Sequence, residues 1–261
     1  MVRKASDVGP LRMGGYGSPV TIKTGAASAS IDQPDYWWYR ARAELLKAAV
    51  GRFVGEPRRV LDVGSADGPS VGWLRGRGQH VSLDIDPRGL DAGGVCGSAL
   101  ALPFADESFD LVAAFDVVEH CDSEAAVLSE LARVLTPRGR LLLSVPAYTW
   151  VWTRFDELSG HYRRYTRRRA VDAVRAAGLT VDRATYMFMS VFPIFAADRL
   201  RTRLRERATD RTDADVATLP QVSPTVERTL MALSQVDQGL LRAFNLPFGS
   251  SVVVAASKSF H

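Results

Sequence analysis

Short runs of apolar residues without polar alternation recur along the middle of the chain. Four of them lie at residues 58–64, 80–86, 108–118 and 140–147, and two more follow at residues 180–189 and 250–258. Runs of this length are typical of strands that are buried on both faces of a parallel sheet. The pattern therefore predicts six strands, most of them in the interior of one sheet.

Amphipathic segments separate these runs and predict helices. Residues 123–135 place apolar side chains on one helix face, at Val127, Leu128, Leu131, Val134 and Leu135. Thr166 and Gly178 are expected to begin and end a second helix, because threonine caps helix N-termini and glycine ends helices. Two more are expected over residues 35–52, with Asp35 as N-cap, and over residues 69–78, with Pro69 in the first turn.

The order of these elements predicts the fold class. Strand and helix alternate from Val60 to Met189, which indicates βαβ units and an α/β fold with a doubly wound, Rossmann-like, mostly parallel sheet. We divide the chain into a flexible tail (1–30), a core with a leading helix (31–191), a helical insertion (192–246) and a final strand (247–261). The insertion holds two helical stretches around a polar linker, and we expect it to cap the ligand crevice.

Composition argues against a disulfide-rich, a zinc-binding and a membrane-spanning protein. The chain has 261 residues, a net charge of +4 and two cysteines, Cys96 and Cys121, which make neither a disulfide framework nor a zinc pattern. No apolar run reaches the roughly 20 residues that a membrane-spanning helix needs. We therefore expect a cytoplasmic protein without a transmembrane segment. Arginines are concentrated at residues 163–169 and 199–205, which fits anionic small molecules as well as nucleic acid.

Acids and glycines follow the first predicted strand and indicate a ligand. Asp62, Gly64, Asp67 and Gly68 lie between an apolar strand and a helical segment, where an α/β sheet binds its ligand. The spacing is not the G-x-G-x-x-G of a dinucleotide site, and carboxylates would repel a diphosphate. They suit a ligand with an ammonium or sulfonium group. Asp84, at the end of the next strand, is placed to bind both hydroxyls of a ribose.

Four successive motifs resemble class I S-adenosylmethionine-dependent methyltransferases. They read VLDVGSADG, VSLDIDP, GSALALPFADESFDLVAAFDVVEH and LARVLTPRGRLLLSVP, and they cover about residues 58–146. The resemblance implies a seven-stranded sheet and an S-adenosyl-L-methionine site. It assigns cofactor binding to Asp62, Gly64, Ser65, Gly68, Asp84, Ile85, Ser98, Ala99 and Phe115. Ser98 and Ala99 stand where the family usually has an acid. From the leading helix, Trp37 could shield the sulfonium and Arg42 could bind a carboxylate of cofactor or substrate.

A narrower resemblance concerns the acceptor. The segments DYWWYRARAELL, WTRFDELSGHYRRYTRRRAVDAVRAAGL and LPFGSSVVVAASK are similar to one bacterial subgroup associated with glycans and secondary metabolites. This favours a small-molecule acceptor, a saccharide or glycosylated metabolite, methylated on a hydroxyl. Transfer to nitrogen of an amino sugar or amine is the alternative, and RNA or protein as substrate is a further one. A cofactor-binding protein without activity is a third class, and the intact glycine loop argues against it.

Transfer to a hydroxyl requires a base, and the candidates follow the fourth and fifth strands. They are Asp116, Glu119, His120, Asp156 and His161, of which Asp156 and His161 could meet around Gly160, with the acid orienting the imidazole. Aromatic and arginine side chains of the same region are expected to bind the acceptor, at Tyr148, Trp152, Tyr162, Arg163 and Arg164.

The sequence says less about a metal ion and about binding partners. Asp116, Glu119 and His161 could hold Mg²⁺, although no motif supports a metal and we assign none. We expect no nucleic acid partner, and the sequence leaves a homodimer open.

Overall fold

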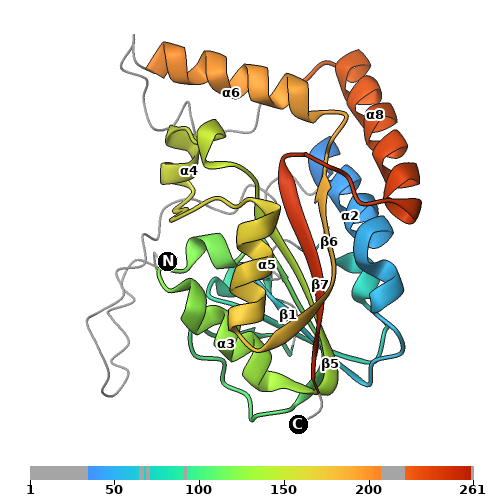
Figure 1. Cartoon of the computed structure of the whole chain (residues 1–261), viewed down its shortest axis with the longest axis vertical. Helices are drawn as coiled ribbons and strands as arrows, with labels where there is room; N and C mark the ends of the chain where they lie inside the picture. Colours follow the sequence, from blue (N-terminus) through green and yellow to red (C-terminus); the bar gives the residue numbers. More distant parts are fainter. Residues whose placement is uncertain (1–34, 65–67, 69–70, 91–92, 207–220, 260–261) are drawn as a thin grey trace, which may run out of the picture.

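One seven-stranded sheet forms the centre of the protein (Figure 1). The computed structural model describes residues 35–64, 68, 71–90, 93–206 and 221–259. The strand order is β3-β2-β1-β4-β5-β7-β6. Every neighbouring pair is parallel except the two that involve β7, which is antiparallel to β5 and to β6. The predicted α/β, doubly wound and mostly parallel sheet is confirmed.

The bounds of the strands follow the apolar runs closely. They are β1 (Arg59–Val63), β2 (Gln79–Asp84), β3 (Val95–Cys96), β4 (Phe109–Phe115), β5 (Leu135–Pro146), β6 (Leu179–Met187) and β7 (Ser251–Lys258). The two-residue β3 was not predicted, because so short a strand has no recognisable pattern. From Val60 onward β1 is buried, as are residues 111–115 of β4 and 251–256 of β7. These strands form the centre of the hydrophobic core.

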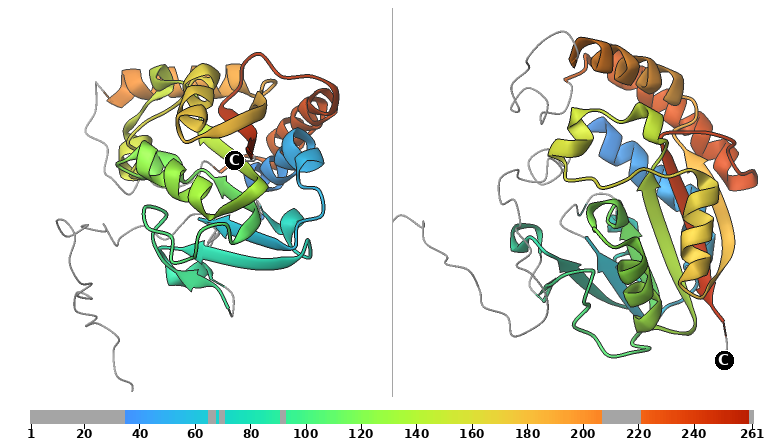
Figure 2. Two further views of the ribbon diagram at one scale, coloured as in Figure 1. Left: turned by 60° about the horizontal axis from the view of Figure 1, so that its bottom comes forward. Right: turned by 60° about the vertical axis from the view of Figure 1, so that its left-hand side comes forward.

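Helices cover both faces of the sheet. They are α2 (Trp37–Val50), α3 (Glu124–Val134), α4 (Arg154–Leu158), α5 (Arg167–Ala176), α6 (Phe192–Glu206) and α8 (Pro224–Ala243). Short 3₁₀ helices lie at η1 (Gly51–Phe53), η3 (Gly72–Leu74), η4 (Pro87–Gly89), η5 (Val118–His120) and η6 (Thr149–Val151). Helices α3 and α5 pack on one face and α2 on the other, with α8 along α2 (Figure 2). Among the described helices, none has the length and apolar character needed to cross a membrane.

The predicted helix ends are confirmed in one case and wrong in two. Thr166 caps α5, since its hydroxyl accepts a hydrogen bond from the backbone N–H of Arg169, and Gly178 follows the helix with φ +81°. Asp35 does not cap α2, whose N-cap is Tyr36. Pro69, expected in the first turn of the helix over residues 69–78, lies outside the described residues. In the described part, residues 71–78, the helix is limited to the three residues of η3, because glycines interrupt the segment and two of them, at positions 76 and 78, have positive φ.

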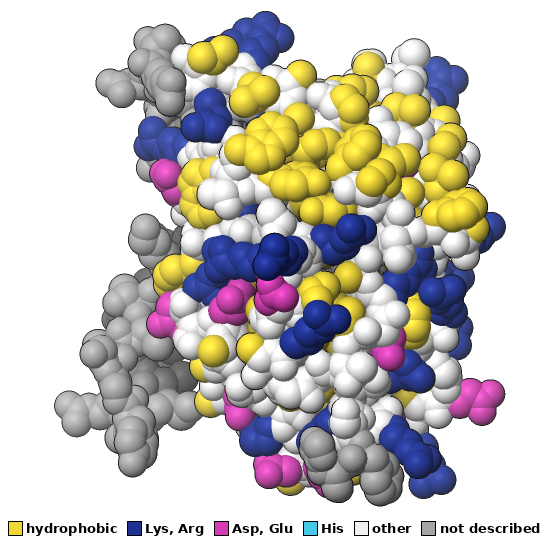
Figure 3. Space-filling view, viewed as in Figure 1, with side chains coloured by type: hydrophobic (Ala, Val, Ile, Leu, Met, Phe, Trp, Pro, Cys, Tyr) yellow, Lys and Arg dark blue, Asp and Glu magenta, His cyan; other side chains and the backbone are white. Residues whose placement is uncertain are grey.

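The insertion before β7 forms two helices with different surroundings. Its α8 joins the main core through Leu230 and Leu241. Helix α6 lies across the carboxyl end of β6, at the top of Figure 1, and packs on η6. The apolar side chains that gather on the upper half of Figure 3 overlie this region, where Trp150 and Phe248 are half-exposed. The role of the insertion as a cap stays a prediction.

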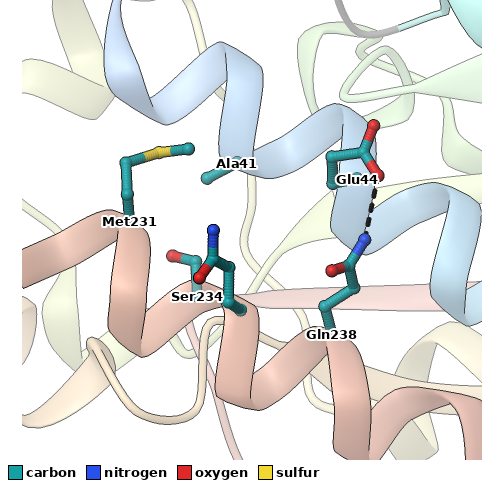
Figure 4. Close-up of a pocket in the computed structure, with 6 residues that line it drawn as sticks. Ala41, Glu44, Met231, Ser234 and Gln238 are labelled. Atoms are coloured by element: carbon teal, nitrogen blue, oxygen red, sulfur yellow. Dashed lines mark hydrogen bonds between the residues drawn. The ribbon is translucent and has the colours of Figure 1, made fainter. Parts of the chain in front are cut away.

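A cavity of about 260 Å³ lies between α2 and α8 (Figure 4). Gln238 bridges the two helices by donating a hydrogen bond to Glu44 at 2.8 Å. None of the predicted site residues lines this cavity, so we assign it no ligand. The predicted tail (1–30), the site residue Ser65 and the linker of the insertion (207–220) lie outside the described residues.

Candidate active site

The first part of the site is the turn after β1. Gly64 has φ +74°, a conformation that glycine adopts without strain, and its N–H donates to the carbonyl of Leu83 at 2.8 Å. A Cβ at this position would lie 2.4 Å from a methyl group of Val117. Asp62 is buried in β1 and Gly68 has φ +35°. Only glycine therefore fits the turn at position 64, which lies at the carboxyl edge of the sheet.

Asp84 ends β2 beside this turn. Its Oδ1 accepts a hydrogen bond from the backbone N–H of Asp86 at 2.8 Å, and its side chain is largely buried. Ile85 follows with half of its surface exposed, as expected for a side chain that flanks a ligand ring. A carboxylate held from one side, with an exposed apolar neighbour, fits a ribose and its base.

The segment after β3 is fastened to α3. Ser98 turns the chain, its Oγ accepting from the N–H of Leu100 at 3.2 Å, while Ala99 packs on the core. Arg133 donates to the carbonyls of Leu102 and Phe104 at 3.0 and 2.8 Å. Glu130 completes the clamp by accepting from Arg133 and from the N–H of Leu102 at 2.7 Å. Sequence reasoning missed this clamp, which holds the loop that carries Ser98 and Ala99.

Arg42 and Trp37 lie deeper than predicted. Trp37 is buried in the core cluster. Arg42 is 1% exposed, and its guanidinium pairs with Asp116 at 2.8 Å and donates to Ser144 at 3.2 Å. Asp116 also accepts from the Ser144 hydroxyl at 2.8 Å. The structure therefore corrects one expectation: Arg42 binds a carboxylate of the chain itself, which leaves it poorly placed to bind one of a ligand.

Two further members of the site belong to β4 and β5. Phe115 is buried at the end of β4, with its ring 6.4 Å from that of Trp73. Ser144 is a fully buried hydroxyl within the apolar strand β5. Sequence reasoning missed Ser144, although a single polar residue inside a buried strand was a usable signal.

The predicted pairing of Asp156 and His161 is present. Asp156 is fully buried, and its Oδ1 lies 2.8 Å from His161 Nδ1 and 2.6 Å from Arg164 Nε. Burial raises the pKa of Asp156, but the hydrogen bond of His161 and the charge of Arg164 outweigh it and bring the pKa to about 2. Because the carboxylate is ionised, Nδ1 of His161 carries a proton and Nε2 is the nitrogen with a free lone pair.

Arg164 supports this pair. It is 4% exposed, and it donates from Nη1 to the carbonyl of Ala147 at 3.0 Å as well as to Asp156. The guanidinium of Arg164 is buried among acceptors of the protein, and a role for it in binding a substrate anion stays a prediction. Its charge stabilises the ionised Asp156.

Glu119 and His120 lie against His161. The backbone N–H of Tyr162 donates to the carbonyl of Glu119 at 2.8 Å, which joins η5 to the segment that carries His161. The rings of His120 and His161 are 4.7 Å apart. Glu119 is 1% exposed, and neither of its carboxylate oxygens receives a hydrogen bond from another described residue. Burial, and then the charge of Asp116, raise the pKa of Glu119 well above its usual value.

The residues that the structure brings together differ from those that the sequence suggested for Mg²⁺. Asp116 is occupied by Arg42 and Ser144, whereas one ligand atom each of Glu119, His120 and His161 lies within 4.8 Å of the others. His120 therefore takes the place that the sequence prediction gave to Asp116.

The aromatic residues predicted to bind the acceptor differ in how much of each ring is open. Tyr148 stacks on Tyr186, with centroids 5.4 Å apart and an interplanar angle of 17°, so one face of its ring is covered. Trp152 is partly exposed and donates to Glu157 at 3.4 Å. Tyr162 is 60% exposed, with the guanidinium of Arg163 over its ring at 5.7 Å. Of these residues, Tyr162 presents the most open ring to a ligand.

Comparison with known proteins gives a match over the part of the chain that carries most of the predicted cofactor residues. A family model described as "Methyltransferase domain" matches residues 61–143. These residues run from β1 through most of β5 and include Asp62, Gly64, Asp84 and Glu119.

Individual relatives extend the match beyond that segment. The chain is 34% identical over 138 residues to the biotin biosynthesis bifunctional protein BioHC of Cellvibrio japonicus, which covers 46% of this chain and only 27% of that protein. It is 30% identical over 195 residues to the malonyl-[acyl-carrier protein] O-methyltransferase of Methylococcus capsulatus, covering 67% of this chain and 70% of that protein.

Among solved structures, phosphoethanolamine N-methyltransferase 2 of Haemonchus contortus in complex with S-adenosyl-L-methionine superposes with a TM-score of 0.50. It is 18% identical, and the superposition covers 90% of this chain and 61% of the other. At this identity the likeness concerns the fold alone. Together with the glycine turn at Gly64 and the carboxylate of Asp84, these relationships show that the chain belongs to the family of class I S-adenosylmethionine-dependent methyltransferases.

Proposed function

We propose that the protein transfers the methyl group of S-adenosyl-L-methionine to a hydroxyl of a small acceptor, a saccharide or a glycosylated metabolite. The observation that carries this proposal is the Asp156–His161 pair, which lies next to Glu119 at the carboxyl end of β4. A buried, ionised carboxylate that orients an imidazole is the arrangement of a general base. Transfer to an amine needs no such base, because the nitrogen lone pair is already available.

The cofactor half of the site rests on the turn at Gly64 and on Asp84. S-adenosyl-L-methionine supplies a methyl group that its sulfonium already activates, so the protein mainly has to position the acceptor and exclude water. We assign the ribose hydroxyls to Asp84, the adenine to the neighbourhood of Ile85 and the 98–104 loop, and the methionine half to the turn after β1. The buried carboxylate of Asp62 adds negative charge on that side.

The aromatic residues predicted to bind the acceptor favour one with a sugar ring and an apolar part. Tyr162 and Trp152 offer ring faces to a saccharide, since flat apolar surfaces stack on sugar rings. Helix α6 contacts the segment that carries Trp152: Arg199 of α6 donates a hydrogen bond to the hydroxyl of Thr153. The half-exposed Trp150 and the outward Ile194 extend an apolar surface from there. An acceptor with an apolar aglycone would fit this surface.

Without a metal ion, His161 is the group placed to accept the acceptor's proton. Asp156 keeps the proton on Nδ1, so Nε2 takes the hydroxyl proton while the oxygen bonds to the methyl carbon. The carbon–sulfur bond breaks and its electron pair stays on sulfur. The resulting imidazolium is stabilised by the ionised Asp156.

Calorimetry tests the cofactor part, and a labelled-methyl screen tests the acceptor. We expect binding of S-adenosyl-L-methionine and S-adenosylhomocysteine but not of NAD, and labelling of hydroxyl acceptors among sugars, glycosides, phenols and amines. His161→Ala should retain cofactor affinity and lose at least 100-fold in turnover, since general-base catalysis contributes about 10²–10⁴-fold. Arg168→Ala, whose side chain is 93% exposed, serves as the control with unchanged turnover.

Two results would contradict the proposal. NAD binding in place of S-adenosyl-L-methionine would exclude methyl transfer. Labelling of amines alone, with His161→Ala as active as the unmodified protein, would replace the hydroxyl acceptor by nitrogen.

A further inference from the structure

A buried carboxylate without a hydrogen-bond donor is the starting point. Glu119 is 1% exposed, yet neither of its oxygens receives a hydrogen bond from another described residue. Two neighbouring acids have donors: the buried Asp156 has three, and the partly buried Asp116 has Arg42 and Ser144. An isolated buried carboxylate is costly unless a cation or a donor compensates it.

The side chains that adjoin Glu119 are two imidazoles. One ligand atom from each of Glu119, His120 and His161 lies within 4.8 Å of the others. His120 is exposed, while 11% of the His161 side chain is exposed, so the cluster is open to solvent on the imidazole side and closed on the carboxylate side. An ion could therefore enter from solvent and reach the buried oxygens.

The orientation of His161 is the one found in metal sites. Its Nδ1 bonds the ionised Asp156 at 2.8 Å, which directs Nε2 away from that carboxylate. Carboxylate–histidine pairs of this kind fix the ring and raise the basicity of the ligating nitrogen. The backbone hydrogen bond from Tyr162 to Glu119 holds the two ligand-bearing segments in register.

We infer that Glu119, His120 and His161 bind one divalent transition-metal ion, such as Mn²⁺, Fe²⁺ or Zn²⁺. Two imidazoles and a carboxylate suit these ions, whereas Mg²⁺ prefers an all-oxygen set. Ligand atoms at about 2.1 Å from an ion lie no more than about 4.2 Å apart, and the three ligand atoms, all within 4.8 Å of one another, are close to this spacing. Three protein ligands leave coordination positions open for oxygen atoms of a substrate.

The consequence for catalysis rests on the proposed function. The ion would supply Lewis-acid chemistry: a bound acceptor hydroxyl would lose its proton to water more readily, and its oxygen would then be the nucleophile for the methyl carbon, with the electron pair of the carbon–sulfur bond left on sulfur. With the ion bound, His161 would serve as a ligand and water would accept the proton, because the ion would lower the pKa of the bound hydroxyl. A saccharide could present two neighbouring hydroxyls to the open positions.

Metal binding can be measured without cofactor or acceptor. The protein is freed of metal with a chelator and titrated with Mn²⁺ by calorimetry and with Co²⁺ by visible spectroscopy. We expect one ion per chain, a Co²⁺ ligand-field band and a rise in melting temperature on addition of Mn²⁺. Glu119→Gln, His120→Ala and His161→Ala should each weaken binding at least tenfold, and Asp156→Asn should weaken it about tenfold through His161.

The controls separate a ligand from a structural residue. Glu107→Gln removes an exposed carboxylate before β4, at the opposite end of that strand, and should leave Mn²⁺ affinity unchanged. Glu119→Gln should keep or raise the melting temperature of the metal-free protein while abolishing the rise on Mn²⁺ addition. The exposed His120 provides a second variant in which folding is not at stake.

Absence of stoichiometric binding, or binding that survives all three ligand substitutions, would overturn the metal site. Either result leaves the methyltransferase proposal intact, with His161 as base. Conversely, a failure to bind S-adenosyl-L-methionine would refute the proposed function without affecting the Mn²⁺ titration.

Discussion

Replacing Gly64 by alanine tests the central feature of the cofactor turn. Two costs arise. A non-glycine residue at φ +74° costs about 1–2 kcal/mol. The new Cβ, 2.4 Å from Val117 Cγ2, must displace a stiff β-branched side chain, and such overpacking costs about 1–3 kcal/mol.

Together these costs lower the free energy of unfolding by about 2–5 kcal/mol, and with about 2–4 °C per kcal/mol the melting temperature should fall by about 4–20 °C. Thermal unfolding followed by circular dichroism measures the shift. Affinity for S-adenosyl-L-methionine should fall with it, because the turn that borders the cofactor has to move. Calorimetry on the folded variant measures that loss.

Two further variants separate the costs. Gly55 has φ +61°, and a Cβ at that position would meet no described atom within 4 Å, so Gly55→Ala should show the conformational cost alone. In Gly64→Ala/Val117→Ala the steric cost should disappear, which a double-mutant cycle reports as a favourable coupling of about 1–3 kcal/mol. If Gly64→Ala is no more destabilising than Gly55→Ala, or if Val117→Ala brings no recovery, the close approach of the turn to Val117 is not what requires glycine.

Three other substitutions test the surroundings of the site. Asp84→Asn keeps an acceptor for the N–H of Asp86 but loses the charge, so calorimetry should show S-adenosyl-L-methionine binding weakened at least tenfold with little change in melting temperature; unchanged affinity would remove Asp84 from ribose binding. Arg133→Met opens the clamp on the 102–104 loop and should cost about 2–3 kcal/mol at neutral pH. Because the hydrogen bond from Arg133 lowers the pKa of Glu130 below its usual 4.5, the part of this contribution that comes from the Arg133–Glu130 pair is present above that pH and is lost as the pH falls through the lowered value. The hydrogen bonds of Arg133 to the two carbonyls do not titrate, so urea titrations should show a smaller difference between the two proteins in acid. Arg183→Met removes a buried guanidinium that donates to Ala49, Leu241 and Phe244 carbonyls at the ends of α2 and α8, and chemical denaturation should show a loss of about 3–5 kcal/mol; a loss below about 1 kcal/mol would mean that solvent replaces these bonds.

The strands could be predicted from the sequence because a doubly buried strand needs a continuous apolar run. Continuous apolar runs as short as those of β1, β4 and β7 are hard to explain except as buried strands. The alternation of such runs with helical segments then predicts a mostly parallel sheet. The helix expected after β1 failed because its apolar residues are interrupted by glycines, whose positive φ at positions 76 and 78 outweighs the spacing. For so short a segment, local conformational preference decided the outcome.

The residues of the candidate site also divide into those that the sequence could locate and those that it could not. Gly64, Asp84 and the Asp156–His161 pair could be located because each depends on a turn or on neighbours close in sequence. The Arg42–Asp116 pair joins α2 to the end of β4, and no local pattern indicates which of several arginines reaches that acid. The clamp of Arg133 on the 102–104 loop was hidden for the same reason.

Asp116 and Glu119 show why the unpredictable contacts matter most for function. Both are acids just beyond β4, less than one helical turn apart in sequence, and both lose solvent on folding. The fold provides Asp116 with Arg42 and the hydroxyl of Ser144, whereas it places Glu119 beside two imidazoles, with no other described residue donating to its carboxylate. A purely structural acid at that position could be replaced by a glutamine or an apolar residue at lower cost. An acid that remains uncompensated beside two histidines is explained best by a cation that arrives from outside the chain, next to the place that we propose for methyl transfer.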